Sequence, residues 1–137
     1  MYIVIPVFNG WPQTRQCLEA LRKSRCQDFH TVIIDHGSGD ETASRLGSDY
    51  PEVTRITAPD HLWWTGATNT GVEYALSAGA GLIMLLNNDC YPEPDCIGTL
   101  LSHYADDSSD EHPRIIAPQL TDSDTLEPLV TAARSCL

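Results

Sequence analysis

Basic residues are scarce in this chain. Among its 137 residues, eight are Lys or Arg and nineteen are Asp or Glu, which gives a formal net charge of −11 at pH 7. Nucleic-acid backbones and anionic lipid surfaces are bound mainly through Lys and Arg. The charge balance therefore excludes nucleic acid from the expected partners and argues against attachment to an anionic membrane surface.

Long apolar runs and a targeting sequence are also lacking. The apolar run Leu82–Leu86 is far shorter than the roughly 20 residues that a membrane-spanning helix needs. The first ten residues carry no basic side chain and reach Asn9 and Gly10 early, so they predict a first strand and not a signal peptide. We expect a chain without a transmembrane segment and with a cytoplasmic location.

Paired cysteine motifs and the common phosphate-binding loops are missing as well. The five cysteines are an odd number without a CxxC pair, which argues against a disulfide framework and a zinc site and favours reduced thiols. Cys90 has no His in a partner motif, so we do not expect it to act as a nucleophile. The glycine spacing matches neither the GxGxxG fingerprint nor a P-loop.

Strand-like and helix-like segments alternate along the sequence. Apolar, β-branched runs predict strands, and segments with helical spacing between them predict helices that Pro and Gly delimit. The expected strands are Tyr2–Val7, His30–Asp35, Val53–Ala58 and Leu82–Leu86, with a further short one at Arg114–Leu120. The expected helices are Pro12–Arg25, a short one with Ser38 or Asp40 as its N-cap, Thr68–Gly79, and one from about Pro94. This order predicts an α/β fold with a mostly parallel sheet covered on both faces, in a single domain over residues 1–137.

Three of the expected strands end in polar, turn-forming residues. Asn9, Asp35 and Asp89 follow apolar runs that lie far apart in the sequence. The carboxyl ends of parallel strands meet at one edge of the sheet, where ligands bind in a crevice at the point of strand-order reversal. We therefore expect these three residues to converge on one crevice.

The segment Asn87–Asp89 supports two readings. A carboxylate with neighbouring amides suits Mg²⁺ or Mn²⁺, which take oxygen ligands and often bind through one or two carboxylates and substrate phosphates. The alternative is a simple turn in which Asp89 caps the next segment of the chain. The acidic surroundings also have two readings, because the ten acids and single Arg114 between Asp89 and Glu127 fit either a solvated surface or a cation-attracting rim.

The sequence DHGSGD, residues 35–40, is similarly open. Gly37 and Gly39 permit positive φ, so backbone N–H groups can point at a ligand, and Asp35 can accept a hydrogen bond from a base or ribose. The alternative is a turn that caps the following helix.

Four motifs stand in order along the chain: IPVFNG, VIIDHGSGDET, LWWTGATNTGVEYAL and LLNNDCYPEPD. Together they resemble the family 2 glycosyltransferases of the GT-A fold, most closely their rhamnosyltransferase-like branch. LLNNDCYPEPD stands at that family's Asp-x-Asp region. The resemblance covers residues 2 to 95, the donor-binding half. It implies a Rossmann-like, three-layer α/β/α fold that is truncated after that half.

The resemblance also implies roles for individual residues. Asp35 matches the acid that contacts the nucleotide base, and Asp89 matches the last acid of Asp-x-Asp, which coordinates the metal. Asn87 replaces the first acid, so one negative charge is lost, and it is expected beside Asp89 at the metal. The expected nucleotide-sugar-binding residues are Pro6, Phe8, Asn9, Asp35, Ser38, Asp40, Gly66, Asn69, Gly71 and Asn88.

Two further departures from the family pattern concern His36, which stands for an acid or amide, and Trp63, which stands for Gly. Both change the fit to the base or sugar. Trp63 and Trp64 are expected before the helix as packing residues, and the alternative is that one ring stacks on a sugar or base.

The expected chemistry is inverting transfer from a nucleoside diphosphate sugar, with dTDP or UDP as the carrier, to an unknown acceptor. Little sequence follows Asp89 to supply a general base, and no catalytic residue is assigned. The acids with some freedom of position are Asp95, Asp122, Asp124 and Glu127. We expect this chain alone to bind the donor, to transfer sugar poorly or not at all, and to self-associate as a homo-oligomer.

Two other functions compete with this prediction. The first is a non-catalytic nucleotide-sugar-binding module without a general base. The second is a nucleotidyltransferase, which is disfavoured because no basic residue precedes Arg15 to hold a triphosphate.

Overall fold

A computed structural model describes residues 1–106, 115–122, 125 and 127. The chain divides into two compact units, Met1–Asp95 and Cys96–Leu137. All the predicted ligand-binding and metal-binding residues lie in the first unit, and the expectation of a single domain over the whole chain stays a prediction. No helix in the described part of the chain is both long and apolar enough to cross a membrane.

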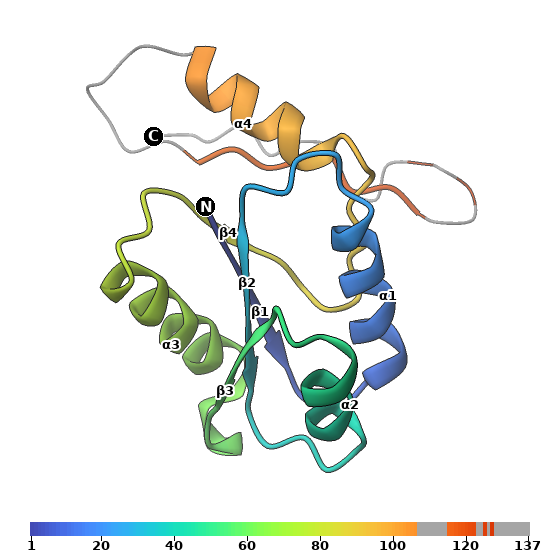
Figure 1. Cartoon of the computed structure of the whole chain (residues 1–137), viewed down its shortest axis with the longest axis vertical. Coiled ribbons are helices and arrows are strands. Elements are labelled where there is room, and N and C mark those ends of the chain that lie inside the picture. The colour runs from blue at the N-terminus through green and yellow to red at the C-terminus, as the bar shows by residue number, and fades with distance from the viewer. Residues whose placement is uncertain (107–114, 123–124, 126, 128–137) are drawn as a thin grey trace. The chain divides into compact units, whose positions relative to one another are not determined.

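The first unit contains a four-stranded parallel sheet (Figure 1). Its strands are β1 (Tyr2–Val7), β2 (His30–Asp35), β3 (Thr54–Thr57) and β4 (Ile83–Leu85), in the order β3-β2-β1-β4. The chain first adds β2 and β3 on one side of β1 and then returns to place β4 on the other side. The strand order therefore reverses at β1, and the switch point lies between β1 and β4.

Helices cover both faces of this sheet. In the first unit they are α1 (Trp11–Arg22), α2 (Thr42–Asp49), the short 3₁₀ helix η1 (Asp60–Leu62) and α3 (Trp63–Ser77). Helix α4 (Cys96–Asp106) belongs to the second unit. Figure 1 shows α3 on one side of the sheet and α1 and α2 on the other. The predicted three-layer α/β/α arrangement is thus confirmed.

The alternation of each strand explains the two packed faces. Val4, Val32 and Ile34 are fully buried in a cluster with Ala67 and Ala75 of α3. The intervening residues of the same strands, such as Ile3 and Ile33, are also fully buried and point to the opposite face. Strands buried on both faces are continuously apolar, as the sequence predicted.

Several predicted boundaries need correction. Helix α1 ends at Arg22 and not at Arg25, and α3 begins at Trp63, five residues before the predicted start at Thr68. Aromatic and β-branched residues and Gly lower helix propensity in this segment, but burial of Ala67 against the sheet overrides that local preference. No strand forms over residues 115–120, where Pro118 removes one backbone donor, and Arg114 lies outside the described residues.

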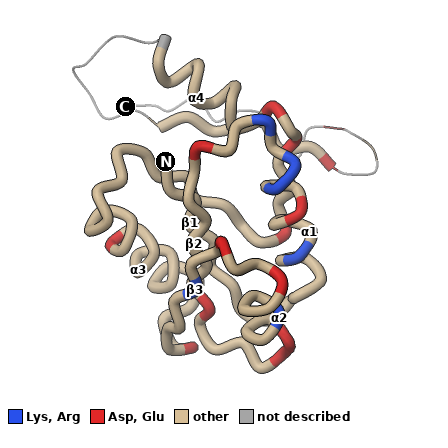
Figure 2. The backbone as a smooth tube through the Cα atoms, viewed as in Figure 1, with Lys and Arg blue, Asp and Glu red and all other residues tan. Residues whose placement is uncertain are grey.

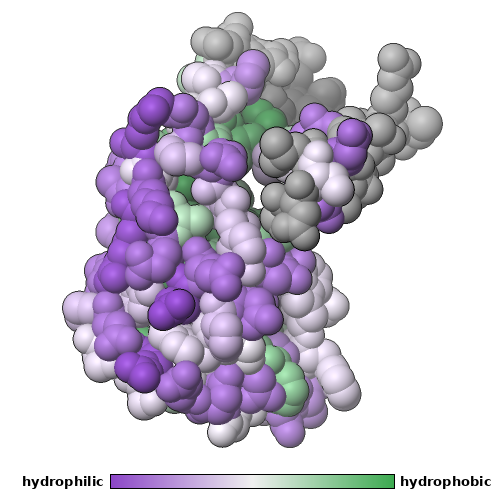
Figure 3. Space-filling view, turned by 90° about the vertical axis from the view of Figure 1, so that its right-hand side faces the viewer, coloured by the Kyte–Doolittle hydropathy of each residue, from purple (hydrophilic) through white to green (hydrophobic). Residues whose placement is uncertain are grey.

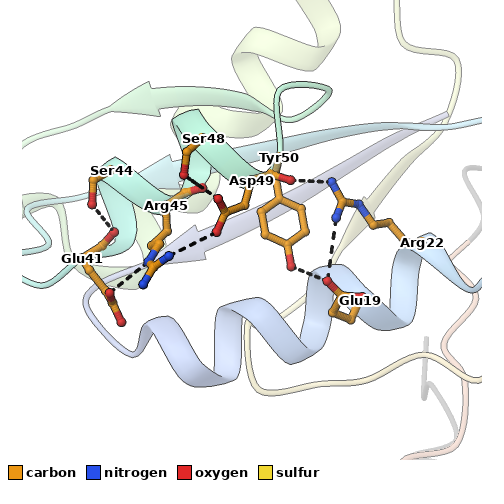
Figure 4. A network of polar contacts seen from close by, with 8 residues as sticks. All are labelled: Glu19, Arg22, Glu41, Ser44, Arg45, Ser48, Asp49 and Tyr50. Atoms are coloured by element: carbon orange, nitrogen blue, oxygen red, sulfur yellow. Dashed lines mark hydrogen bonds and ion pairs between the residues drawn. The ribbon is translucent and has the colours of Figure 1, made fainter.

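A polar network ties α1 to the end of α2, away from the carboxyl edge (Figure 4). The buried Tyr50 donates its hydroxyl hydrogen bond to Glu19 at 2.7 Å, and the guanidinium of Arg22 lies 4.0 Å from the Tyr50 ring centroid. Burial, and next the Glu19 carboxylate, raise the pKa of Tyr50 to about 12. Tyr50 therefore stays protonated and keeps its role as donor throughout the physiological range.

The charged groups are distributed unevenly over the first unit (Figure 2). Most of its basic residues lie on or just after α1, namely Arg15, Arg22, Lys23 and Arg25. The face that Figure 3 turns to the viewer is hydrophilic over most of its described atoms. By contrast, the turns that directly follow β1, β2, β3 and β4, the last taken as residues 86–90, carry four acids and no Lys or Arg: Asp40, Glu41, Asp60 and Asp89.

Candidate functional site

The candidate site is the edge of the sheet where the strands end. Register pairs Val7 with Asp35 and Asp35 with Thr57, so the carboxyl ends of β1, β2 and β3 are level with one another. Between β1 and β4 the last aligned pair is Val4 and Leu85, and the backbone N–H of Leu86 still donates to the Val4 carbonyl. Beyond that point the two strands are no longer paired.

Pro6 explains why this pairing stops. The N–H of Tyr2 donates to the Leu82 carbonyl and the carbonyl of Val4 accepts from β4, so the even-numbered residues of β1 direct their backbone groups towards β4. Pro6 is the next even-numbered residue and has no N–H. It is buried, so its place at the site is through the backbone: it ends the β1–β4 ladder at the switch point.

Asn9 links the loops after β1 and β2 through hydrogen bonds. Its backbone N–H donates to Ser38 Oγ and its Oδ1 accepts from the Gly39 N–H, both at 2.8 Å. Asn9 and Gly10 both have positive φ, 57° and 74°, which turns the chain sharply into α1. Asn9 and Ser38 therefore lie at the predicted edge, but they use these polar groups to shape it.

Asp40 caps two helices at once. Its Oδ2 accepts from the Trp11 N–H at the start of α1 and its Oδ1 from the Thr42 N–H at the start of α2, both at 3.0 Å. Partial burial raises the pKa of Asp40, but the hydrogen bonds from Thr42 and Trp11 outweigh it and hold the pKa below its ordinary value. The helix-capping reading of residues 35–40 is confirmed, although the N-cap position itself is Glu41 and not Ser38 or Asp40.

Both carboxylate oxygens of Asp35 also accept hydrogen bonds from neighbouring residues. Its Oδ1 accepts from the Ser38 N–H at 3.0 Å, and its Oδ2 accepts from Arg55 Nε at 3.0 Å and Nη2 at 2.7 Å. The Asp35 side chain is 2% exposed and that of Arg55 is 33% exposed. Contact between Asp35 and a base stays a prediction, and it would require Arg55 to make room. Sequence reasoning missed Arg55, which β3 places on the same face of the sheet as Asp35.

A double-mutant cycle tests this ion pair. Asp35→Asn keeps an acceptor for the Ser38 N–H but removes the charge, and Arg55→Gln removes the opposite charge. We expect each to lower the free energy of unfolding by about 1–2 kcal/mol, a value reduced because Arg55 is one-third exposed. Urea unfolding should show that the double variant loses about 1 kcal/mol less than the sum of the single losses. If the loss in the double variant equals the sum of the two single losses, the stabilising ion pair between Asp35 and Arg55 is contradicted.

Phe8 and His36 form a stacked pair beside these loops. Their ring centroids lie 5.4 Å apart with an interplanar angle of 22°, and Phe8 is 54% exposed. His36 is buried, and its Nδ1 has no hydrogen-bond partner among the described residues. Phe8 therefore offers an open aromatic face at the predicted base and ribose position.

The β4 loop supplies the candidate metal position. The N–H of Cys90 donates to the Asn87 carbonyl at 3.1 Å, so residues 87–90 form a turn, as one reading predicted. Asn88 donates through Nδ2 to Thr14 Oγ1 at 3.0 Å, and Asn87 Oδ1 accepts from the Trp64 indole N–H at 3.0 Å. Asp89 is exposed, and the one hydrogen bond its carboxylate makes with a described residue comes from the Cys90 thiol, with Sγ 3.9 Å from Oδ1.

These donor atoms fit Mg²⁺ or Mn²⁺. The Asp89 carboxylate accepts no N–H hydrogen bond from the described residues, so its oxygens are available to a hard cation. Within residues 1–106, 115–122, 125 and 127, no three His, Cys, Asp or Glu side chains are grouped to hold a metal alone. A cation here would take most of its oxygens from a ligand. One Asn87 lone pair is already occupied, which weakens the predicted role of Asn87 as a metal ligand.

Helix α3 separates its three predicted binding residues. Asn69 is exposed and Gly66 is half-buried, whereas Gly71 is buried against the sheet. A Cβ at Gly71 would lie 2.2 Å from Val4 Cγ1 and 3.0 Å from Ile34 Cγ1. Gly71 therefore faces the core, and its role is to let α3 approach β1 and β2. This placement favours packing over the predicted ligand contact of Gly71, which stays a prediction.

The paired tryptophans lie in the first turn of α3 and not before the helix. Trp63 is 76% exposed and has φ 50° and ψ −171°, a region almost restricted to Gly and costing about 1–3 kcal/mol for other residues. The family's Gly at this position matches that backbone. Trp64 is 51% exposed, so the prediction that both rings serve mainly in packing is wrong.

Two thiols near Asp89, those of Cys17 and Cys90, have raised pKa values. Burial, then the nearby Cys90 and Asp89, raise the pKa of Cys17 to about 12. Burial, and next Asp89, also raise the pKa of Cys90. Both shifts favour the protonated thiol at neutral pH.

An open groove of about 710 Å³ lies between α1 and residues 91–94. None of the predicted ligand-binding or metal-binding residues lines this groove. The site is instead the strand-end edge described above.

The fold and this edge define a doubly wound α/β domain with an exposed carboxylate, that of Asp89, at its topological switch point. The chain belongs to glycosyltransferase family 2, because the profile described as Glycosyl transferase family 2 matches residues 2–129. This match extends beyond residue 95, where the quoted motifs end. The rhamnosyltransferase-like branch within the family stays a prediction.

Similar proteins agree with this assignment. PGL/p-HBAD biosynthesis glycosyltransferases of Mycobacterium bovis (strain BCG / Pasteur 1173P2) and Mycobacterium tuberculosis (strain ATCC 25177 / H37Ra) are each 31% identical over 98 residues. The match covers 69% of this chain and 38% of each relative, so the chain spans well under half of their length.

Solved structures show the same fold. Staphylococcus aureus TarS 1–349 superposes with a TM-score of 0.67 at 14% identity, over 86% of this chain and 38% of that chain. The mannosyltransferase PcManGT from Pyrobaculum calidifontis, in complex with GDP-Man and Mn²⁺, has a TM-score of 0.59 at 17% identity, over 78% and 32% of the two chains. The first unit therefore has the predicted GT-A fold.

Proposed function

We propose that the first unit binds a nucleoside diphosphate sugar together with Mg²⁺ or Mn²⁺, as the donor half of an inverting glycosyltransferase. The observation that carries the proposal is the position of Asp89 at the switch point between β1 and β4, where its carboxylate accepts no N–H hydrogen bond from the described residues. Family membership supports it, as do solved relatives of the same fold described with UDP, UDP-GlcNAc, or GDP-Man and Mn²⁺.

Charge supports the requirement for a metal. The turns after the four strands carry Asp40, Glu41, Asp60 and Asp89 but no Lys or Arg. The nearest cation on β3, Arg55, is paired with Asp35. A diphosphate at this edge would meet carboxylates, so its binding would require the charge of a divalent cation, which Asp89 would hold. When bound, such a cation stabilises the departing diphosphate as a Lewis acid.

The remaining edge residues supply shape and orientation. Phe8 offers its exposed ring to the base and ribose, and Asn9, Ser38 and Asp40 hold the two loops below it in place. The predicted carriers are dTDP and UDP, and the base stays open to test because solved relatives are described with both uridine and guanosine nucleotides.

Calorimetry with UDP, dTDP, GDP and ADP, each with Mn²⁺, with Mg²⁺ and with EDTA, tests this function. We expect one of the first three to bind, with an affinity that falls at least tenfold in EDTA. Quenching of Trp fluorescence provides a second readout, because Trp63 and Trp64 are both exposed. The proposal would be contradicted if none of these nucleotides bound, or if their affinities were the same with metal and with EDTA.

Sugar transfer requires a general base as well, and none is assigned. The Asp95 carboxylate accepts from Arg25 Nη1 at 2.7 Å through both oxygens, so it is engaged in an exposed ion pair. Asp122 accepts from the Thr125 N–H at 2.9 Å, and Asp124 lies outside the described residues. Donor binding without efficient transfer, as in a non-catalytic module, therefore stays our prediction for this chain alone. Self-association and the cytoplasmic location stay predictions too.

A further inference from the structure

Trp64 is the side chain that joins α3 to the candidate metal loop. Its indole Nε1–H donates to Asn87 Oδ1 at 3.0 Å, across 23 residues of sequence. An indole can only donate, so the contact fixes both the tip of the Trp64 ring and the orientation of the Asn87 amide. Asn87 in turn lies two residues before Asp89. The ring is therefore held next to the carboxylate expected to bind the metal and the diphosphate.

The Trp64 ring is anchored by a hydrogen bond but remains half-exposed. Trp64 is 51% exposed although its polar tip is satisfied and its carbonyl accepts from Thr68 Oγ1 at 2.8 Å. A tryptophan that served only in packing would bury most of its apolar surface, because that burial is what stabilises it. An anchored, half-open aromatic ring beside a diphosphate position has the form of a binding platform.

We propose that Trp64 is the sugar platform of the donor site and that Asn87 is the residue that positions it. The inference rests on the proposed function. In a nucleoside diphosphate sugar, the group that continues from the diphosphate is the sugar, so it would meet the side chain next to Asp89. Ring faces of aromatic residues suit the C–H faces of a pyranose. Asn87 thus acts through the Trp64 ring and not as a second metal ligand.

The test compares nucleoside diphosphates with their sugars. Calorimetry with Mn²⁺ uses three pairs: UDP and UDP-glucose, dTDP and dTDP-glucose, and GDP and GDP-mannose. The quantity of interest is the dissociation constant of the nucleoside diphosphate divided by that of its nucleotide sugar. General damage to the fold changes both constants equally and leaves this ratio unchanged. Trp64→Ala should leave nucleoside diphosphate affinity within about twofold and should weaken nucleotide-sugar affinity about threefold to tenfold.

Matched variants separate the platform from its anchor. Asn87→Asp keeps an acceptor for the indole N–H and should preserve the ratio, whereas Asn87→Leu removes the acceptor and should lower it. Trp64→Phe keeps a ring without the anchor and should give an intermediate ratio. Trp63→Gly removes the more exposed neighbouring ring at a backbone conformation that suits Gly, and it should leave the ratio unchanged.

The outcomes separate the platform from the proposed function. An unchanged ratio in Trp64→Ala overturns the sugar platform while the proposed function stands. Should that variant fail to fold, an unchanged ratio in both Trp64→Phe and Asn87→Leu overturns it equally. A wild-type chain that binds none of the nucleotides overturns the proposed function, and the platform with it.

Discussion

Asp89→Asn is expected to abolish the metal-dependent part of nucleotide binding. The substitution removes the single carboxylate of residues 87–89. Loss of even an outer-shell partner of a metal typically costs 10- to 100-fold in metal affinity, so loss of a direct ligand should cost at least about 100-fold. Calorimetric titration of Mn²⁺ in the presence of the tightest nucleotide measures this loss directly.

The fold should tolerate this change. Asp89 is exposed, and its carboxylate accepts a hydrogen bond only from the Cys90 thiol among the described residues, so the free energy of unfolding should move by less than about 0.5 kcal/mol. Glu93→Gln is the matched control, because it removes the same charge from an exposed position four residues away. The assigned role of Asp89 would be contradicted if Asp89→Asn kept the wild-type Mn²⁺ affinity, or if Glu93→Gln lost as much Mn²⁺ affinity as Asp89→Asn.

Gly71→Ala should destabilise the first unit more than any other single methyl group added to a glycine in it. The new Cβ would lie 2.2 Å from Val4 Cγ1, and both Val4 and Ile34 are fully buried and cannot swing aside. Helix α3 would have to move away from the sheet. Overpacking of this kind costs about 1–3 kcal/mol or more, which outweighs the gain of up to about 1 kcal/mol in helix propensity.

Gly47→Ala is the control for this experiment. Gly47 lies inside α2, and a Cβ there meets nothing within 4 Å, so only the propensity gain applies. Thermal unfolding should therefore show a lower Tm for Gly71→Ala and an unchanged or raised Tm for Gly47→Ala. A shift of α3 would also displace Trp64, so nucleotide-sugar binding should weaken in the first variant alone. An unchanged Tm in Gly71→Ala would show that the close approach of α3 is not required.

The strands and their order of appearance could be predicted from the sequence. Tyr2–Val7 and His30–Asp35 agree with the structure to the residue, since continuous apolar runs end abruptly in turn-forming groups. Convergence of the strand ends followed from parallel pairing alone. The start of α3 could not be predicted, because burial of Ala67 against the sheet, a tertiary effect, decides it.

The partners of individual polar groups were beyond sequence reasoning. Asp35, Ser38 and Asp40 were predicted as ligand-binding residues because their chemistry suits a ligand. That chemistry suits a neighbouring loop equally well, and only the register of the sheet shows which groups meet. The pairing of Arg55 with Asp35 depends on the β2–β3 register, and the Trp64–Asn87 contact depends on where α3 begins. Gly71 shows a related ambiguity, because a glycine allows close approach either of a ligand or of a packed core, and the sequence does not separate the two.

The fastening of the β1 and β2 loops by Asn9, Ser38 and Asp40 has a kinetic consequence. A loop whose polar groups already bond to each other has little conformational entropy left to lose when a ligand arrives. Association at the base end of the strand-end edge should then be limited by encounter and not by loop rearrangement, so affinity differences among nucleotides should lie in their dissociation rates. Slow, conformationally gated steps would belong to the other end of this edge, where β1 and β4 are unpaired beyond Val4.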